Sequence, residues 1–162
     1  MDLLNEFKTI CFHLNKIGII PTLMGSLALE FVSKEKWNPS DIDIHVPGDP
    51  RGWEAPDELR IYDWDKIMSI MEDLGYKLID THEHEFEKDR LSVEYGTINS
   101  LYDFAGILES DIEIIEEDDI KFRVPSIKQF LSIYEALSKD SYRNDNNNNK
   151  DFLKIDWLKK HI

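Results

Sequence analysis

Two aspartates stand two residues apart in a segment that alternates between polar and apolar side chains. The segment reads Asp41-Ile42-Asp43-Ile44-His45-Val46. Because successive side chains of a β-strand point to opposite faces, this pattern predicts a strand with both carboxylates on one face. Neighbouring carboxylates repel, and such hard oxygen ligands suit Mg²⁺, which usually takes one or two carboxylates together with substrate phosphates. The alternative is an edge strand whose polar face is simply solvated.

A glycine-serine step precedes the aspartates, and fourteen residues separate Ser26 from Asp41. Gly25 and Ser26 follow the apolar run Ile19 to Met24 and precede a short apolar segment, which predicts a strand, a tight turn and a short helix. Glycine lets the backbone approach a ligand, and a helix N-terminus presents free N–H groups and a positive dipole end to phosphate. The alternative is that Ser26 only caps the helix.

These two features in combination form a recognisable pattern. Met24-Gly25-Ser26, a spacer from Leu27 to Ser40 and then Asp41-Ile42-Asp43-Ile44 resemble the motif of the nucleotidyltransferase superfamily related to DNA polymerase beta. The resemblance covers residues 1 to about 100 and is strongest to small bacterial antibiotic and minimal nucleotidyltransferases. It implies an α+β (α/β) fold, with a small mixed sheet flanked by helices and two C-terminal helices.

The resemblance implies a third carboxylate on a neighbouring strand. Glu94 is the candidate, because it alternates against Val93 and Tyr95 in a predicted strand from Leu91 to Ile98. Asp89 is the reserve, although it stands in the charged segment Glu87 to Arg90, which predicts a solvated turn.

The resemblance implies a Mg²⁺-dependent nucleotidyl transfer. A nucleoside monophosphate would move from a nucleoside triphosphate such as ATP to a hydroxyl of a small-molecule acceptor, and pyrophosphate would be released. Asp41, Asp43 and Glu94 would be the catalytic residues and the ligands of two metal ions. Gly25 and Ser26 would cradle the triphosphate. His45 shares the face of the aspartates and is a candidate nucleotide or acceptor contact.

Other interpretations stay open. A catalytically silent module of the same fold, such as one component of a toxin and antitoxin pair, would need a partner chain. His82 and His84 have metal-ligand spacing along a strand, which is the basis of a weaker zinc-hydrolase hypothesis. The loop from Pro47 to Asp63, with Trp53, could cover a nucleotide. Candidate triphosphate partners outside the motif are Arg51, Arg90 and Arg143.

The remaining periodicities predict the elements that hold these residues. Helices are expected over the first 17 residues, over Trp64 to Leu74 and after Ser126, where Ser126 and Gln129 have the spacing of a capping box. A last helix follows the Asn-rich loop Asn144 to Asn149 and carries Phe152, Leu153, Ile155 and Leu158. A strand is expected from Tyr76 to about Asp80, with an extension through His84 as the alternative. A hairpin of Ile112 to Ile115 and Lys121 to Val124 is expected across Glu116 to Asp119.

Composition limits the class of protein. A chain of 162 residues is expected to form a single domain over 1–162, with a core over 1–100 and a hairpin and helices over 111–162. Its 33 acidic and 19 basic residues give a net charge of −14, which disfavours extended nucleic acid as a partner. The single Cys11 and the lack of a long apolar run predict a cytoplasmic protein without membrane spans. A homodimer is a possible assembly.

Overall fold

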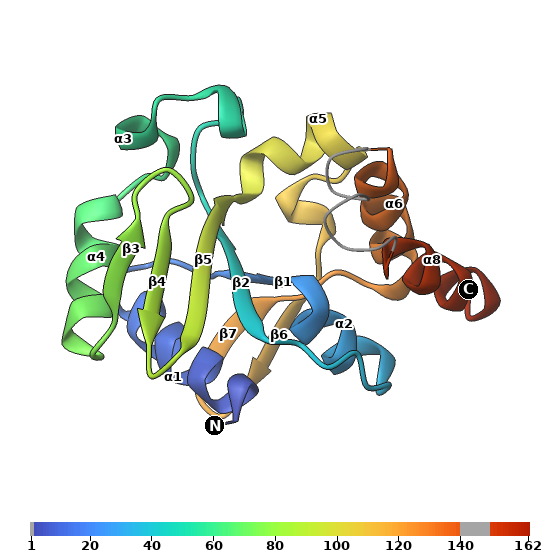
Figure 1. The fold of residues 1–162 in the computed structure, drawn as a ribbon, viewed down its shortest axis with the longest axis horizontal. Coiled ribbons are helices and arrows are strands. Elements are labelled where there is room, and N and C mark those ends of the chain that lie inside the picture. The colour runs from blue at the N-terminus through green and yellow to red at the C-terminus, as the bar shows by residue number, and fades with distance from the viewer. Residues whose placement is uncertain (1, 140–149) are drawn as a thin grey trace.

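The computed structural model describes residues 2–139 and 150–162. The strands of these residues form one seven-stranded mixed sheet in the order β3-β4-β5-β2-β1-β7-β6 (Figure 1). Their bounds are β1 Thr22–Met24, β2 Asp41–Val46, β3 Lys77–Asp80, β4 Glu85–Lys88, β5 Leu91–Thr97, β6 Ile114–Glu117 and β7 Ile120–Arg123. The pairs β2–β5 and β1–β7 are parallel, and the other neighbours are antiparallel.

Helices flank this sheet, as the sequence predicts. Their bounds are α1 Leu3–Lys16, α2 Gly25–Ser33, α3 Asp57–Arg60, α4 Trp64–Asp73, α5 Leu101–Ala105, α6 Ile127–Ser138 and α8 Lys150–Lys160. Helices α6 and α8 pack together at the C-terminal end of the chain (Figure 1). The predicted fold class is therefore confirmed. In the part of the chain that the structure describes, no helix combines the length and apolarity that crossing a membrane requires.

The register of the central strands is fixed by their apolar face. Ile42 and Ile44 of β2 and Val93 of β5 are fully buried, together with the stripe of α1 that begins at Phe7. A slip of one residue would move these side chains to the other face and the carboxylates into the core. The strict alternation of β2 therefore determines where its acidic side chains lie.

Local sequence signals account for several boundaries. Ser126 and Gln129 form the predicted capping box at the start of α6, with each side chain bonded to the backbone N–H of the other. The predicted C-terminal hairpin is present, but its turn is the shorter Asp118-Asp119, and both residues have positive φ. Gly25 has φ +71 where β1 becomes α2, a conformation that favours glycine.

Two predictions of local structure were wrong. The strand from Tyr76 does not extend to His84: it ends at Asp80, and the chain turns and returns as β4. The loop from Pro47 to Asp63 contains the short helix α3 and a 3-10 turn, Gly52–Glu54. A further element, α5, had no counterpart among the predictions. The Asn144 to Asn149 stretch and Arg143 lie outside the described residues.

Candidate active site

The three predicted carboxylates lie together on the polar face of adjacent strands. In the parallel pairing of β2 with β5, Asp43 is directly opposite Glu94, and Asp41 is opposite Ser92. Alternation puts Asp41 on the same face as Asp43, with Ile42 buried between them on the other face. The structure thus brings Glu94 beside the aspartates, whereas Asp89 lies in the exposed turn between β4 and β5.

A fourth carboxylate, which sequence reasoning missed, joins this group. Glu85 is the first residue of β4 and pairs directly with Glu94, and its carboxylate accepts a hydrogen bond from the Ser92 hydroxyl. The sequence signal that could have located Glu85 is the turn at residues 81–84. A turn there makes β4 a separate strand, and β4 then pairs with β5 and places Glu85 beside Glu94.

Crowding and burial disfavour ionisation of this group. Burial, followed by the charges of Asp43, Glu85, Asp41 and Glu83, raises the pKa of Glu94 from 4.5 to about 7. Burial, followed by Asp43 and Glu85, likewise raises the pKa of Asp41, and Lys154 opposes that rise. A cation bound at this face would relieve the repulsion.

The glycine-serine step adjoins these carboxylates. Met24 pairs with Asp43 across β1 and β2, and a Cβ atom added to Gly25 would lie 3.2 Å from Cβ of Asp43. The N-cap position of α2 is Met24, and it makes no side-chain capping bond. Ser26 is therefore inside the first turn, and the capping explanation for its presence does not hold. The N-terminus of α2 begins beside Asp43.

Lys154 of α8 supplies a cation that the sequence did not reveal. Its Nζ donates a hydrogen bond of 2.9 Å to the Ser26 hydroxyl, and it lies 4.9 Å from the ring centroid of Tyr134. Its positive charge favours the ionised form of Asp41 and opposes the rise in the pKa of that group. The spacing of residues along the last helix gives no clue to this position, because it depends on how α8 packs against the rest of the chain.

The packing of α8 explains why Lys154 reaches Ser26. Ile155 and Leu158 are buried, and the Trp157 ring meets the Trp37 ring edge-on with centroids 6.0 Å apart. Trp37 belongs to the loop between α2 and β2, so α8 docks beside the segment that joins the two motif elements. Phe152 and Leu153, which the sequence assigned to the apolar set of this helix, are exposed.

His45 lies next to Asp43 on the same face. Its Nε2 is 3.4 Å from Oδ1 of Asp43, and its imidazole lies over Gly96 on β5. A Cβ atom at Gly96 would be 2.8 Å from that nitrogen, so the glycine provides the space that the ring occupies.

His82 and His84 belong to a different cluster. Asp57 accepts a hydrogen bond of 2.9 Å at Oδ1 from each of Nδ1 of His82 and Nη2 of Arg60. His84 is buried against Trp64, and burial lowers its pKa. These contacts attach the segment after β2 to the turn before β4, which supports a structural role for both histidines rather than the zinc hypothesis.

The predicted cationic partners lie elsewhere. Arg51 is held by Asp49 through a 2.7 Å ion pair in an exposed loop. Arg90 occupies the exposed turn between β4 and β5. Trp53 is exposed, and its ring is 5.0 Å from the His82 ring, so the segment from Pro47 to Asp63 contacts the turn at residues 81–84.

Within residues 2–139 and 150–162, no three His, Cys, Asp or Glu side chains converge closely enough to form a metal cage by themselves. Mg²⁺ does not require such a cage, because it commonly binds through one or two carboxylates and completes its shell with water and substrate phosphates. The donor set at Asp41 and Asp43 fits that mode of binding.

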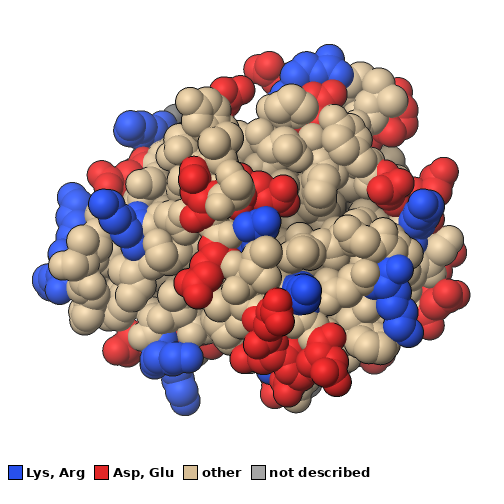
Figure 2. Space-filling model, turned by 180° about the vertical axis from the view of Figure 1, so that it is seen from behind, with Lys and Arg blue, Asp and Glu red and all other residues tan. Residues whose placement is uncertain are grey.

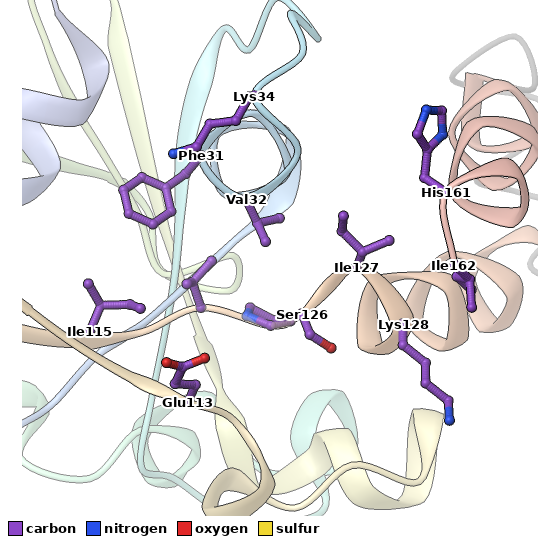
Figure 3. A pocket seen from close by; sticks show the side chains of 12 residues that line it. Phe31, Val32, Lys34, Glu113, Ile115, Ser126, Ile127, Lys128, His161 and Ile162 are labelled. Carbon is purple, nitrogen blue, oxygen red and sulfur yellow. The ribbon is translucent and has the colours of Figure 1, made fainter.

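An apolar groove of about 520 Å³ lies at a different place on the molecule (Figure 3). Phe31 and Val32 of α2 face Ile115 of β6 and Ile127 of α6 across it. None of the four site carboxylates is among its lining residues.

Figure 2 shows one face of the molecule, seen from behind the view of Figure 1. Lys and Arg side chains stand there in small separate groups among Asp and Glu side chains. Nucleic-acid partners require a continuous basic surface, and the described residues form none on this face.

Comparison with known proteins places the chain in a family. No protein-family model matches it. It is 37% identical over 165 residues to the uncharacterized protein YnaI of Bacillus subtilis (strain 168), and the match covers 100% of this chain and 99% of YnaI. The chain belongs to the YnaI family.

This YnaI-family chain also resembles a solved structure. The solution structure of the antibiotic-resistance factor ANT(2'')-Ia matches it with a TM-score of 0.56, covering 98% of this chain and 89% of that chain, at 12% sequence identity. At that identity the likeness concerns the fold alone. The nucleotidyltransferase fold predicted from the motif is confirmed for this YnaI-family member.

The raised pKa of Glu94 predicts a stability effect that needs no ligand. A carboxyl whose pKa is higher in the folded than in the unfolded chain destabilises the fold as pH rises from about 4.5 through about 7. Glu94→Gln removes this charge. We expect the variant to be more stable than the parent by about 1–2 kcal/mol at pH 8, allowing for the partial exposure of the group, and equally stable near pH 4.5.

Thermal denaturation in metal-free buffer at the two pH values measures this difference. Glu72→Gln, an exposed position on α4, is the matched control and should show no difference that depends on pH. Equal melting temperatures for the parent and Glu94→Gln at pH 8 would contradict the electrostatic account.

Proposed function

We propose that this chain is a nucleotidyltransferase that moves a nucleoside monophosphate from a nucleoside triphosphate to a hydroxyl of a small-molecule acceptor. The observation that carries the proposal is the close approach of Gly25, at the start of α2, to Asp43, which pairs with Glu94. This arrangement puts an anion-binding helix N-terminus directly beside a group of carboxylates. A nucleoside triphosphate would bind at the helix N-terminus, and the divalent cations that accompany it would bind the carboxylates.

Asp41 and Asp43 would hold Mg²⁺, and Glu94 would share a second ion with them. The fit rests on hard oxygen donors and on the repulsion that raises the pKa of both Glu94 and Asp41. When bound, the ions would neutralise charge on the attacking and leaving oxygens.

The chain's own groups would bind and orient the reactants. The N–H groups at the start of α2, the Ser26 hydroxyl and the Lys154 ammonium are donors that suit the phosphates. In the transfer, the acceptor oxygen forms a bond to the α-phosphorus, the bond from that phosphorus to the bridging oxygen breaks, and pyrophosphate leaves. Glu94 would take the proton of the acceptor hydroxyl, a role open to a carboxylate that stands directly opposite Asp43 at the proposed metal site.

The second candidate is a catalytically silent binding module of the same fold. The observation in its favour is the apolar groove between α2, β6 and α6, since grooves of this kind can receive a partner chain (Figure 3). Glu94 is half-buried rather than occluded, and it is grouped with the other carboxylates, which favours the enzyme.

Asp41→Asn tests the metal assignment, because it removes a charge while keeping the shape of the side chain. In the parent, a saturating nucleoside triphosphate with Mg²⁺ should raise the melting temperature by about 5–10 °C. We expect Asp41→Asn to lose this rise and, because it also removes a repelled charge, to melt no lower than the parent without ligand. Differential scanning fluorimetry with ATP, GTP, CTP and UTP, each with and without Mg²⁺, measures both quantities.

Asp73→Asn, at the exposed end of α4, is the matched control and should respond to nucleotide like the parent. If Asp41→Asn gains the same Mg²⁺-dependent stabilisation, the metal assignment is wrong. If the parent responds to no nucleotide, the silent module becomes the better account.

Lys154→Met tests the role of α8 in nucleotide binding. Since a charged hydrogen bond to phosphate contributes more than a neutral one, we expect its loss to weaken nucleotide affinity by about tenfold to a hundredfold. Isothermal titration in Mg²⁺ measures the affinity. Lys159→Met, an exposed position on the same helix, should bind like the parent, and unchanged affinity of Lys154→Met would remove α8 from the site.

A further inference from the structure

Three buried polar atoms lack a hydrogen-bond partner in the part of the chain that the structure describes. They are Oγ1 of Thr22, Nδ1 of His45 and Nε of Arg123. An unpaired polar group in the interior loses its hydrogen bonds to water without replacement, so each of these atoms requires an explanation.

The three atoms belong to one row across the sheet. Thr22 of β1 is paired with His45 of β2 on one side and with Arg123 of β7 on the other. Side chains at paired positions stand on the same face of a sheet, with Cβ atoms about 4.5–5.5 Å apart. The row therefore runs from Arg123 through Thr22 to His45, and His45 lies beside Asp43.

The hydrogen-bonding groups of these side chains can form one continuous series of donors and acceptors, which runs from Arg123 to Asp43. The Asp43 carboxylate only accepts hydrogen bonds, so the facing Nε2 of His45, 3.4 Å away, is suited to donate. A neutral imidazole that donates from Nε2 has an acceptor at Nδ1, and the Thr22 hydroxyl can donate to it. The Thr22 oxygen can in turn accept from Nε–H of Arg123, which can only donate.

The ends of the row are held in place. Nη1 of Arg123 donates to the backbone oxygen of Ile112, which anchors the guanidinium. Thr22 is fully buried, and Gly96 leaves the space that the His45 ring needs. Small rotations of the three side chains, or a bridging water with two or more polar partners, would complete the bonds.

We infer that Arg123, Thr22 and His45 form a buried hydrogen-bond relay that fixes the orientation of the Asp43 carboxylate. These are positioning residues, since each acts on the site through Asp43. The relay rests on the proposed function in one respect: its consequence for metal binding requires Asp43 to be a metal ligand. Groups that orient a ligating carboxylate in this way typically change metal affinity by about tenfold to a hundredfold.

The test combines a spectroscopic readout with a binding readout. Long-range ¹H–¹⁵N correlation of the histidine rings at pH 8.5, without metal, reports which nitrogen of His45 carries the proton, and His45→Gln assigns the signal. We expect the Nε2–H tautomer in the parent, a mixture of tautomers in Thr22→Val and the parent spectrum in Thr22→Ser. In a Mg²⁺ titration, we expect Thr22→Val to bind about tenfold more weakly and Thr22→Ser to bind normally.

Thr9→Val, an exposed threonine of α1, controls for the substitution itself and should match the parent in both readouts. A parent spectrum with the proton on Nδ1, or a Thr22→Val spectrum identical to that of the parent, overturns the relay. The tautomer needs neither metal nor nucleotide, so it decides the relay even if the parent binds no Mg²⁺ and the proposed function fails. If Thr22→Val does not fold, the parent tautomer and Thr22→Ser decide it.

Discussion

The pairing of β2 with β5 places acidic side chains next to one another on one face of the sheet. Asp43 stands directly opposite Glu94, and Glu85 flanks Glu94 from β4. The sheet cannot relieve this repulsion by slipping, because the same strands bury Ile42, Ile44 and Val93 on their other face. The hydrophobic core therefore holds the carboxylates together, and the raised pKa of Glu94 is the consequence.

Two other features of the site bring positive charge close to these carboxylates. The N-terminus of α2 starts beside Asp43, and α8 brings Lys154 to Ser26. Helix α8 is distant in sequence from the motif, and its docking on the loop after α2 joins the C-terminal helices to the site. The acidic strands all lie before residue 98, and the fold thus depends on its last helix to complete the anion-binding side.

Sequence patterns predicted the features that depend on local periodicity. Alternation located Asp41, Asp43 and Glu94 on strands, and the glycine-serine step located the turn before α2. Glu85 was missed because the polar residues before it form a turn, which left no apolar alternation to mark β4. Lys154 could not be predicted, since its position follows from tertiary packing of α8 and from no spacing along the chain.

If the face shared by β2 and β5 binds a divalent cation, paramagnetic Mn²⁺ should bind there too. Substoichiometric Mn²⁺ broadens the NMR signals of nearby backbone amides. We expect the amides of Gly25, Asp41, Asp43 and Glu94 to broaden first and excess Mg²⁺ to restore them. Sharp signals at these residues, with broadening confined to the acidic hairpin turn at Asp118 and Asp119, would contradict it.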